Sequence, residues 1–395
     1  MRSLRSLALA VVLTTCTTCA SFAQTSAQPP IKIGILTELS GPLGPSGAGQ
    51  RDGFLLFLKK NGNRLGGRAV ETIIEDTGND PQTTITKAKK LAESDHVDLL
   101  MGPLSSANGA AVRNYLIAQK LPTLLEATVD EIGDGKYIFR TSFSGNADSY
   151  LQGYLPGKAG FRKAIVVAPN FNAGQTGADY FERGFVAAGG KVVQRILPRL
   201  GTPDYGSVVG QFSAEADVGI IFMAGGDAIR FVKAFADYGK KLPLYGFTAT
   251  VDETLLPAQG KAALGFTGAG FYFSTIDSPV NRQFVADYQA AYKQNPAWFS
   301  AGGYIAAQAI DAALMRTGGK VDDREAMVTA LRSVRLVTPA GNFAFDENHN
   351  PIQPRYVMQV REVNGVIRPV ILGVIPEFKP VAEPPTLPAG LVLPR

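Results

Sequence analysis

The clearest pattern along the chain is the alternation of short apolar runs with segments of helical periodicity. Residues 97–101 form an apolar run, a Gly- and Ser-containing break follows, and 110–119 has helical periodicity before a second apolar run at 121–125. Two buried parallel strands joined by a helix are typical of this pattern. We therefore expect a strand–helix–strand unit over residues 97–125.

The same alternation continues through most of the chain and restarts after about residue 142. Alternating strands and helices indicate an α/β fold with parallel sheets, and the restart indicates two doubly wound lobes with a cleft between them. Further strands are expected at 31–39, 70–75, 163–168, 191–197, 218–223, 244–247, 268–273, 342–345, 355–360 and 366–374. Further helices are expected at 48–61, 81–93, 173–188, 205–214, 227–238, 279–293, 300–317 and 323–331.

The break before residues 110–119 carries the first candidate chemistry. Ser105 or Ser106 suits the N-cap of the helix. A helix start combines free backbone N–H groups, a hydroxyl and the positive end of the helix dipole, all of which suit an anion. The loop after the next strand ends beside it, at the carboxyl edge where open α/β sheets bind ligands. Taken alone, this stretch is explained most simply by a capping role for Ser106.

Composition narrows the class of protein. The chain has 395 residues and is 45% hydrophobic, which is enough for two cores. The net charge is +5, but no run of Lys and Arg alternates with aromatic residues, so we expect no nucleic acid partner. Beyond the N-terminus, no stretch is long and apolar enough to span a membrane.

The N-terminus has the layout of a signal peptide. Two arginines and an apolar run at 7–13 precede small residues that end at Ala23, so we expect residues 1–23 to be removed on export to the periplasm. Cys16 and Cys19, the only cysteines, lie inside this segment. Each follows a threonine, a poor position for lipid attachment, so we expect a mature chain without cysteine, disulfide or lipid anchor.

Residues suited to catalysis are scarce. His96 and His349 are the only histidines, and neither has metal-ligand spacing. No Gly-x-Ser-x-Gly elbow, P-loop or dinucleotide-binding fingerprint is present. We therefore expect no enzyme, metal or cofactor. An exported enzyme that uses carboxylates alone, such as Glu38, Glu126 or Asp227, remains the alternative.

The order and spacing of several short motifs resemble the ABC-transporter periplasmic substrate-binding proteins of the leucine/isoleucine/valine-binding family. The resemblance extends to about residue 372, and its motifs are Ile33-Gly34-Ile35-Leu36, Ser40-Gly41-Pro42, Glu75-Asp76, Gly102-Pro103-Leu104-Ser105-Ser106, Phe139-Arg140-Thr141, Gly174, Gly225-Gly226 and Tyr304. It implies the type I periplasmic binding protein fold, with two Rossmann-like lobes joined by three crossovers. We place the lobes at 31–142 plus 275–339 and at 143–274 plus 340–374. The Pro-rich end, 376–395, is predicted to be a disordered tail.

The resemblance also implies where a ligand binds: between the lobes, which close by a hinge motion. On the first lobe, the ligand carboxylate is implied at Ser106, beside Ser105, and at Ala127. Val129 replaces the usual threonine, with Thr128 next to it.

On the second lobe, Thr248 occupies the position of the acid that usually holds an amino-acid ammonium, and Asp227 lies near a position that is often tyrosine. The usual aromatic positions match Ser46 and Ala173. Other aromatic residues, Phe171, Phe299, Trp298 and Tyr272, are available to line a pocket, although each is individually explained by ordinary core packing.

These departures favour a ligand without an ammonium group, because burying an unpaired ammonium costs several kcal/mol. We expect a monomer that binds an aromatic or other hydrophobic carboxylate and delivers it to an ABC permease. Two alternatives remain: a branched-chain or other amino-acid binding protein in which Asp227 or Glu126 contacts the cation, and a ligand-sensing module for a separate membrane receptor.

Overall fold

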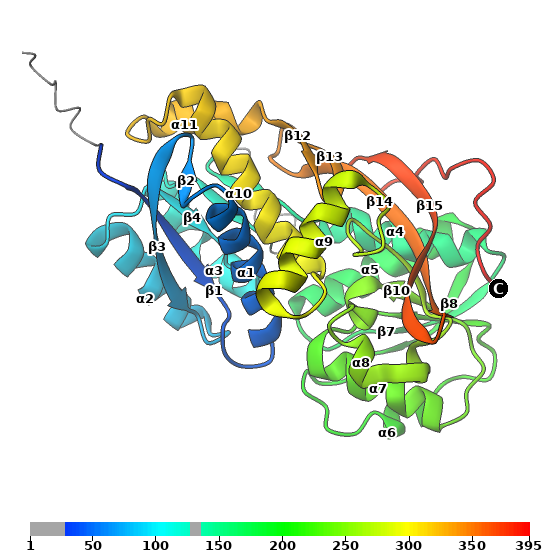
Figure 1. The fold of residues 1–395 in the computed structure, drawn as a ribbon. Helices are drawn as coiled ribbons and strands as arrows, with labels where there is room; N and C mark the ends of the chain where they lie inside the picture. Colours follow the sequence, from blue (N-terminus) through cyan, green and yellow to red (C-terminus); the bar gives the residue numbers. More distant parts are fainter. Residues whose placement is uncertain (1–27, 127–135) are drawn as a thin grey trace, which may run out of the picture.

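The computed structural model describes residues 28–126 and 136–395. The predicted signal peptide and the predicted ligand contacts Ala127, Thr128 and Val129 lie outside these ranges. Figure 1 shows two lobes side by side, with α9 and α10 running between them.

The first lobe is built on a six-stranded sheet in the order β2-β3-β1-β4-β5-β6, parallel except for the β2–β3 pair. Central β1 has no exposed surface at Ile31, Ile33 and Ile35, as expected of a parallel strand covered on both faces. The strands are β1 (Ile31–Thr37), β2 (Arg64–Leu65), β3 (Arg68–Asp76), β4 (Leu99–Met101), β5 (Thr123–Leu125) and β6 (Ile138–Arg140).

Helices cover both faces of this sheet. The helices that pack in the first lobe are α1 (Gly44–Lys60), α2 (Pro81–Lys89), α3 (Ser106–Ala118), α9 (Pro279–Tyr292), α10 (Trp298–Thr317) and α11 (Arg324–Arg332), and a turn of π-helix, Lys90–Ser94, continues α2. Helices α1 and α10 touch through their backbones. A Cβ on Gly53 would lie 1.9 Å from the carbonyl oxygen of Ser300, and one on Gly303 would lie 2.0 Å from that of Gln50. This close approach fixes the first turn of α10 beside α1.

The second lobe contains the parallel strands β8-β7-β9-β10-β11, extended by antiparallel β14, which also pairs with β13 and β15. The strands of this lobe are β7 (Lys163–Val167), β8 (Lys191–Ile196), β9 (Val218–Ile221), β10 (Leu244–Phe247), β11 (Thr267–Gly270), β13 (Gly341–Phe345), β14 (Pro351–Val363) and β15 (Val366–Phe378). Strand β12 (Arg335–Thr338), from the segment predicted to belong to the first lobe, pairs with β13 at the edge of this sheet. The helices of the second lobe are α4 (Gly145–Lys158), α5 (Asn172–Ala187), α6 (Gly206–Gly210), α7 (Gly225–Asp237) and α8 (Leu256–Gln259), with 3₁₀ turns at Thr248–Val251 and Gly260–Ala263.

Helix α4 was not predicted from the sequence. It is buried on most sides and contains Pro156, so it has neither the apolar stripe of a surface helix nor an uninterrupted helical composition. It follows the first crossover, which is the segment between β6 and α4 (residues 141–144), and it packs against α5, β10 and β11 in the second lobe.

Buried polar contacts hold the crossover segments together. Asp148 on α4 forms a bidentate ion pair with Arg355 on β14, with Nη2 of the arginine 2.9 Å from Oδ2, and both side chains are buried. At the end of β6, Arg140 Nε donates to Asn350 Oδ1 at 2.9 Å. Gln353 donates to the carbonyl oxygen of Ser142. The first crossover is therefore tied to the segment that enters β14.

The predicted disordered tail instead packs against the second lobe. Strand β15 extends to Phe378, and Leu387, Leu391 and Leu393 lie against the hydrophobic core. At the end of the chain, Arg395 Nη2 donates to the carbonyl oxygen of Gly160 at 3.2 Å. Prolines limit the freedom of the unfolded tail, so little entropy opposes this packing.

Replacing Asp148 with Asn should lower the free energy of unfolding by about 3–5 kcal/mol, because it leaves the Arg355 charge buried without its counter-ion. Urea denaturation followed by circular dichroism measures the change. The matched control is Asp277→Asn, which breaks an exposed ion pair with Arg282 and should cost no more than about 1 kcal/mol. Equal effects of the two substitutions would contradict this account.

Deleting residues 380–395 should lower the free energy of unfolding by about 2–3 kcal/mol, since three partly buried leucines lose their contacts. Urea titration of the truncated and full-length chains measures the difference. Leu391→Ala should reproduce part of the loss. An unchanged denaturation midpoint in the truncated chain would show that the tail does not contribute to stability.

Candidate functional site

The predicted anion site at the start of α3 is organised by a residue that the sequence analysis did not place there. Ser105 occupies the N-cap position, but its side chain makes no capping hydrogen bond. The Glu38 carboxylate instead accepts from the backbone N–H groups of Leu104 at 3.0 Å and Ser105 at 3.1 Å, and from Asn108 Nδ2 at 2.6 Å. Glu38 therefore occupies part of the anion-binding capacity of this helix start.

Ser106 is the first residue of α3 and is buried. Its predicted partners in holding a carboxylate, residues 127–129, lie outside the described residues, so this half of the predicted site remains a prediction.

A cavity of about 270 Å³ lies between the two lobes. The lobes approach closely at its wall, where a Cβ on Gly225 would lie 3.3 Å from the carbonyl oxygen of Pro42. Its lining comes from the first lobe (Pro42, Pro45, Ser46, Gly49, Tyr288, Gln294, Ala297, Phe299, Ser300) and from the second (Ala224, Gly225, Gly226, Ile229, Ala249, Asp252, Thr254, Leu255).

Three helices begin at this cavity. The first residues of α1, α7 and α10, or the residues just before them, form part of its wall. No Lys, Arg or His belongs to the described lining. The groups in the described lining that favour an anion are therefore backbone N–H groups at helix starts, not cationic side chains.

The aromatic residues named from the sequence divide between this cavity and the core. Phe299 lines the cavity. Trp298 is buried beneath it, with its ring centroid 4.4 Å from that of Phe143, and Tyr272 is also buried. Phe171 is the N-cap residue of α5 and is 37% exposed. The structure thus brings one of the four aromatic residues into the cavity wall.

Among the second-lobe positions, Asp227 is buried in the first turn of α7. Its carboxylate accepts from the backbone N–H of Gly201 at 2.9 Å and forms an ion pair with Arg230. Thr248 is buried next to the lining residue Ala249, and Ala173 is buried in α5. Neither Asp227 nor Thr248 lines the cavity itself.

Asp252 is the acidic residue of the described cavity lining, and the sequence analysis missed it. Its Oδ1 accepts from the backbone N–H of Thr254 at 2.9 Å and from the Thr254 hydroxyl at 2.6 Å. Burial raises the pKa of Asp252 above the usual carboxyl value. Hydrogen bonds from Thr254 and from the backbone N–H of Trp298 act in the opposite direction and offset part of this rise. The Asp-x-Thr spacing, typical of a turn in which Asp accepts from a nearby backbone N–H, was the available signal.

The remaining carboxylate named from the sequence, Glu126, is buried within the first lobe against α10. A Cβ on Gly302 would lie 2.2 Å from its Oε2, so the carboxyl group needs a glycine there. Burial raises the pKa of Glu126 well above the usual carboxyl value and favours its neutral form. Glu126 does not contribute to the cavity lining.

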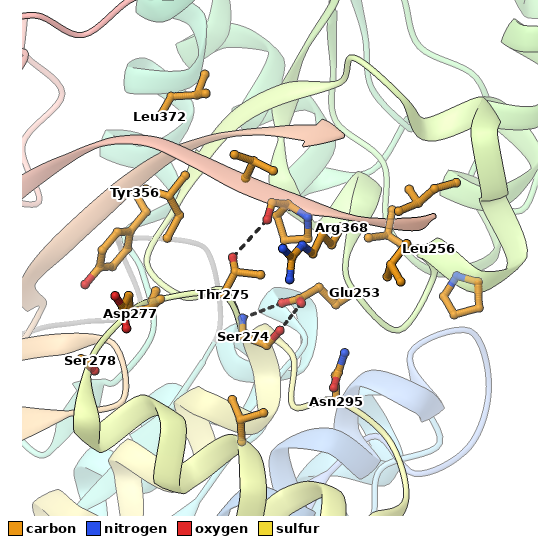
Figure 2. Close-up of a pocket in the computed structure, with 18 of the residues that line it drawn as sticks. Glu253, Leu256, Ser274, Thr275, Asp277, Ser278, Asn295, Tyr356, Arg368 and Leu372 are labelled. Carbon is orange, nitrogen blue, oxygen red and sulfur yellow. Dashed lines mark hydrogen bonds between the residues drawn. The ribbon is translucent and has the colours of Figure 1, made fainter. Parts of the chain in front are cut away.

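A second, more open hollow of about 1200 Å³ lies between α9 and β15 (Figure 2). Glu253 accepts here from the backbone N–H of Ser274 at 2.7 Å and from the Ser274 hydroxyl, and Thr275 donates to the carbonyl oxygen of Pro369 at 3.1 Å. Burial raises the pKa of Glu253 to about 7. These bonds hold the second crossover, between β11 and α9, against the second lobe.

Within residues 28–126 and 136–395, no helix combines the length and apolar character that crossing a membrane requires. In the same part of the chain, no group of three or more His, Cys, Asp or Glu side chains is arranged to hold a metal ion.

Comparison with known proteins supplies the family. The sequence profile of the periplasmic binding protein family matches residues 30–365. An ABC transporter substrate-binding protein from Sphaerobacter thermophilus is 33% identical, with a TM-score of 0.85 over 90% of this chain and 100% of that one. An ABC-transporter solute-binding protein from R. palustris, solved in complex with benzoate, is 28% identical, with a TM-score of 0.83 over 92% and 99% of the two chains.

A curated relative, Leu/Ile/Val-binding protein homolog 6 of Brucella melitensis, is 28% identical over 346 residues, which are 85% of this chain and 88% of the relative. The predicted resemblance and the predicted two-lobed fold are both confirmed. The profile match, the relatives and the two α/β lobes agree: this chain belongs to the periplasmic binding protein family of ABC-transporter substrate-binding proteins.

Proposed function

We propose that this protein is the periplasmic component of an ABC importer and captures a small aromatic or other hydrophobic monocarboxylate between its lobes. The observation that carries the proposal is the interlobe cavity, where three helices begin and no cationic side chain is present among the described lining residues. The start of α1 has no acid in its first turn, whereas Asp227 lies in the first turn of α7 and Asp252 accepts from the start of α10. Helix starts attract an anion without supplying a full positive charge that would need its own counter-ion.

The size and lining of the cavity fit a single ring. Its volume of about 270 Å³ lies just below the range of cavities that hold drug-sized ligands. Phe299, Leu255, Ile229 and the two prolines supply apolar surface. Burying a ring of about 150 Å² at roughly 25 cal/mol per Å² contributes about 4 kcal/mol before the costs of binding.

The absence of an acid at Thr248 favours the same ligand class. An amino acid would bring an ammonium group, and Asp227, the nearest predicted partner, already binds Gly201 and Arg230. The relative from R. palustris was solved with benzoate. Amino-acid binding is the second candidate function, because Asp252 places one carboxylate in the cavity wall.

In this proposal the chain is exported by residues 1–23 and acts as a monomer. Ligand binding draws the unit 31–142 plus 275–339 against 143–274 plus 340–374, and a membrane permease recognises the closed form. Ligand identified by mass spectrometry after gentle purification tests the ligand class directly.

Benzoate should bind more tightly than leucine, because it brings apolar ring surface and no ammonium that needs a partner. Side-by-side isothermal titration measures both affinities. Asp227→Asn should leave the order of the two ligands unchanged. Tight leucine binding that is lost in Asp227→Asn would instead identify an amino-acid binding protein.

Ser106 lies at the start of α3 and does not belong to the described lining of the cavity, so its predicted contact requires a ligand carboxylate that extends from the cavity to α3. In that arrangement Ser106→Ala should weaken benzoate binding about tenfold or more, since a hydrogen bond to a charged group contributes roughly 1.5–3 kcal/mol. Its effect on stability should stay near or below 1 kcal/mol, because Glu38 rather than Ser106 satisfies the N–H groups before α3. Calorimetry and thermal denaturation give the two values. Ser105→Ala is the neighbouring control, and equal affinities in all three proteins would place the carboxylate elsewhere.

A further inference from the structure

Asp252, the acid in the cavity wall, points to a preference among aromatic acids. This inference rests on the function proposed above. We propose that Asp252 selects aromatic acids that carry a ring hydroxyl group, by accepting a hydrogen bond from that hydroxyl. The inference names both a specificity-determining residue and the substrate class that it recognises.

Asp252 belongs to a part of the cavity wall that does not suit a carboxylate, because two like charges repel each other. It faces the start of α10, where the backbone N–H of Trp298 contributes to its hydrogen bonding. The starts of α1 and α7 approach each other between Pro42 and Gly225. The first turn of α1 contains no acid. An anionic group is favoured near α1, whereas a hydrogen-bond donor is favoured near Asp252.

The hydrogen bonds of Asp252 leave room for one more donor. Both bonds from Thr254 go to Oδ1, and a carboxylate has about four acceptor sites on its two oxygens. A ring that lacks a donor offers Oδ2 no hydrogen bond when the lobes close on it, which is unfavourable for a buried polar group. A phenolic hydroxyl donates a charge-assisted hydrogen bond to the carboxylate instead.

Other polar groups surround the same part of the cavity. The hydroxyl of Tyr288 interacts with Ser300 and Gln294, and all three residues belong to the lining. Burial raises the pKa of Tyr288 to about 12, so this hydroxyl is neutral and can donate or accept. A hydroxylated ring therefore meets polar partners here, whereas an unsubstituted ring covers them with C–H groups.

An ammonium group is the other donor that a carboxylate could accept, but the surroundings of Asp252 favour a neutral one. The Thr254 hydroxyl, two backbone N–H groups and the positive end of α10 already offset part of its negative charge. A neutral hydroxyl adds a hydrogen bond without requiring a full charge of opposite sign.

The test is calorimetric titration of benzoate, 3-hydroxybenzoate and 4-hydroxybenzoate into the full chain and into Asp252→Asn. Asparagine keeps an Oδ1 acceptor for Thr254 and replaces Oδ2 with an NH₂ donor, so the turn is retained while the acceptor is lost. The original chain should bind at least one hydroxybenzoate about ten- to a hundredfold more tightly than benzoate. In Asp252→Asn this ratio should fall to near one, and in the control Asp277→Asn it should stay unchanged.

The outcomes separate the two proposals. Tight binding of benzoate with no preference for a hydroxylated acid overturns the role of Asp252 and leaves the proposed function standing. Binding of no aromatic acid at all overturns both. Tight leucine binding that is lost in Asp252→Asn overturns the hydroxyl assignment, because Asp252 would then hold an ammonium group. Thermal denaturation of each variant verifies that it is folded.

Discussion

The site depends on the geometric constraint that helices following parallel strands begin at the same edge of the sheet. Strand β1 leads into α1 and β9 into α7, so both helix starts face the space between the lobes. Helix α10 follows no strand of this kind. Its start reaches the same space because Gly53 and Gly303 let it touch α1 through the backbone. Two sheets and one close helix contact thereby bring three helix starts to one pocket that has no cationic side chain among its described residues.

Two of the acids around this space, Glu38 and Asp227, already have hydrogen-bond partners within the protein. Glu38 accepts from the chain entering α3, and Asp227 accepts from Gly201 and Arg230. Glu126 is buried within the first lobe. Asp252 is different because it belongs to the cavity wall itself. The main cost of burying a polar molecule is a charge or polar group left without a partner. The distribution of acids therefore decides which kind of ligand can bind without this cost.

Buried polar contacts hold the crossover segments that connect the two lobes. The ion pair of Asp148 with Arg355 and the hydrogen bond of Arg140 with Asn350 are buried beside the first crossover. Glu253 holds the second crossover through Ser274. Removing one member of a buried pair leaves an uncompensated charge, so these contacts resist local unfolding. In the closure proposed above, the lobes would therefore move as bodies, with their internal packing retained.

The sequence by itself determined the two-lobed α/β fold and the family, because apolar periodicity and short motifs record which segments are buried strands and which are helices. Of the positions named from the sequence, Ser46, Phe299 and Gly225-Gly226 belong to the described cavity lining, whereas the other described site candidates do not: Ser105, Ser106, Phe171, Ala173, Asp227 and Thr248. The sequence did not reveal helix α4, which is buried on most sides and so has no polar face to mark it.

Only the tertiary structure decided which acid faces the ligand space and which are occupied elsewhere. The partners of Glu38 are 66 to 70 residues away in sequence, and Asp227 binds a residue 26 positions before it. Asp252 meets the start of α10 across the lobe boundary. Contacts between residues so far apart leave no periodic or compositional mark on either segment, because each depends on how separate elements are packed together.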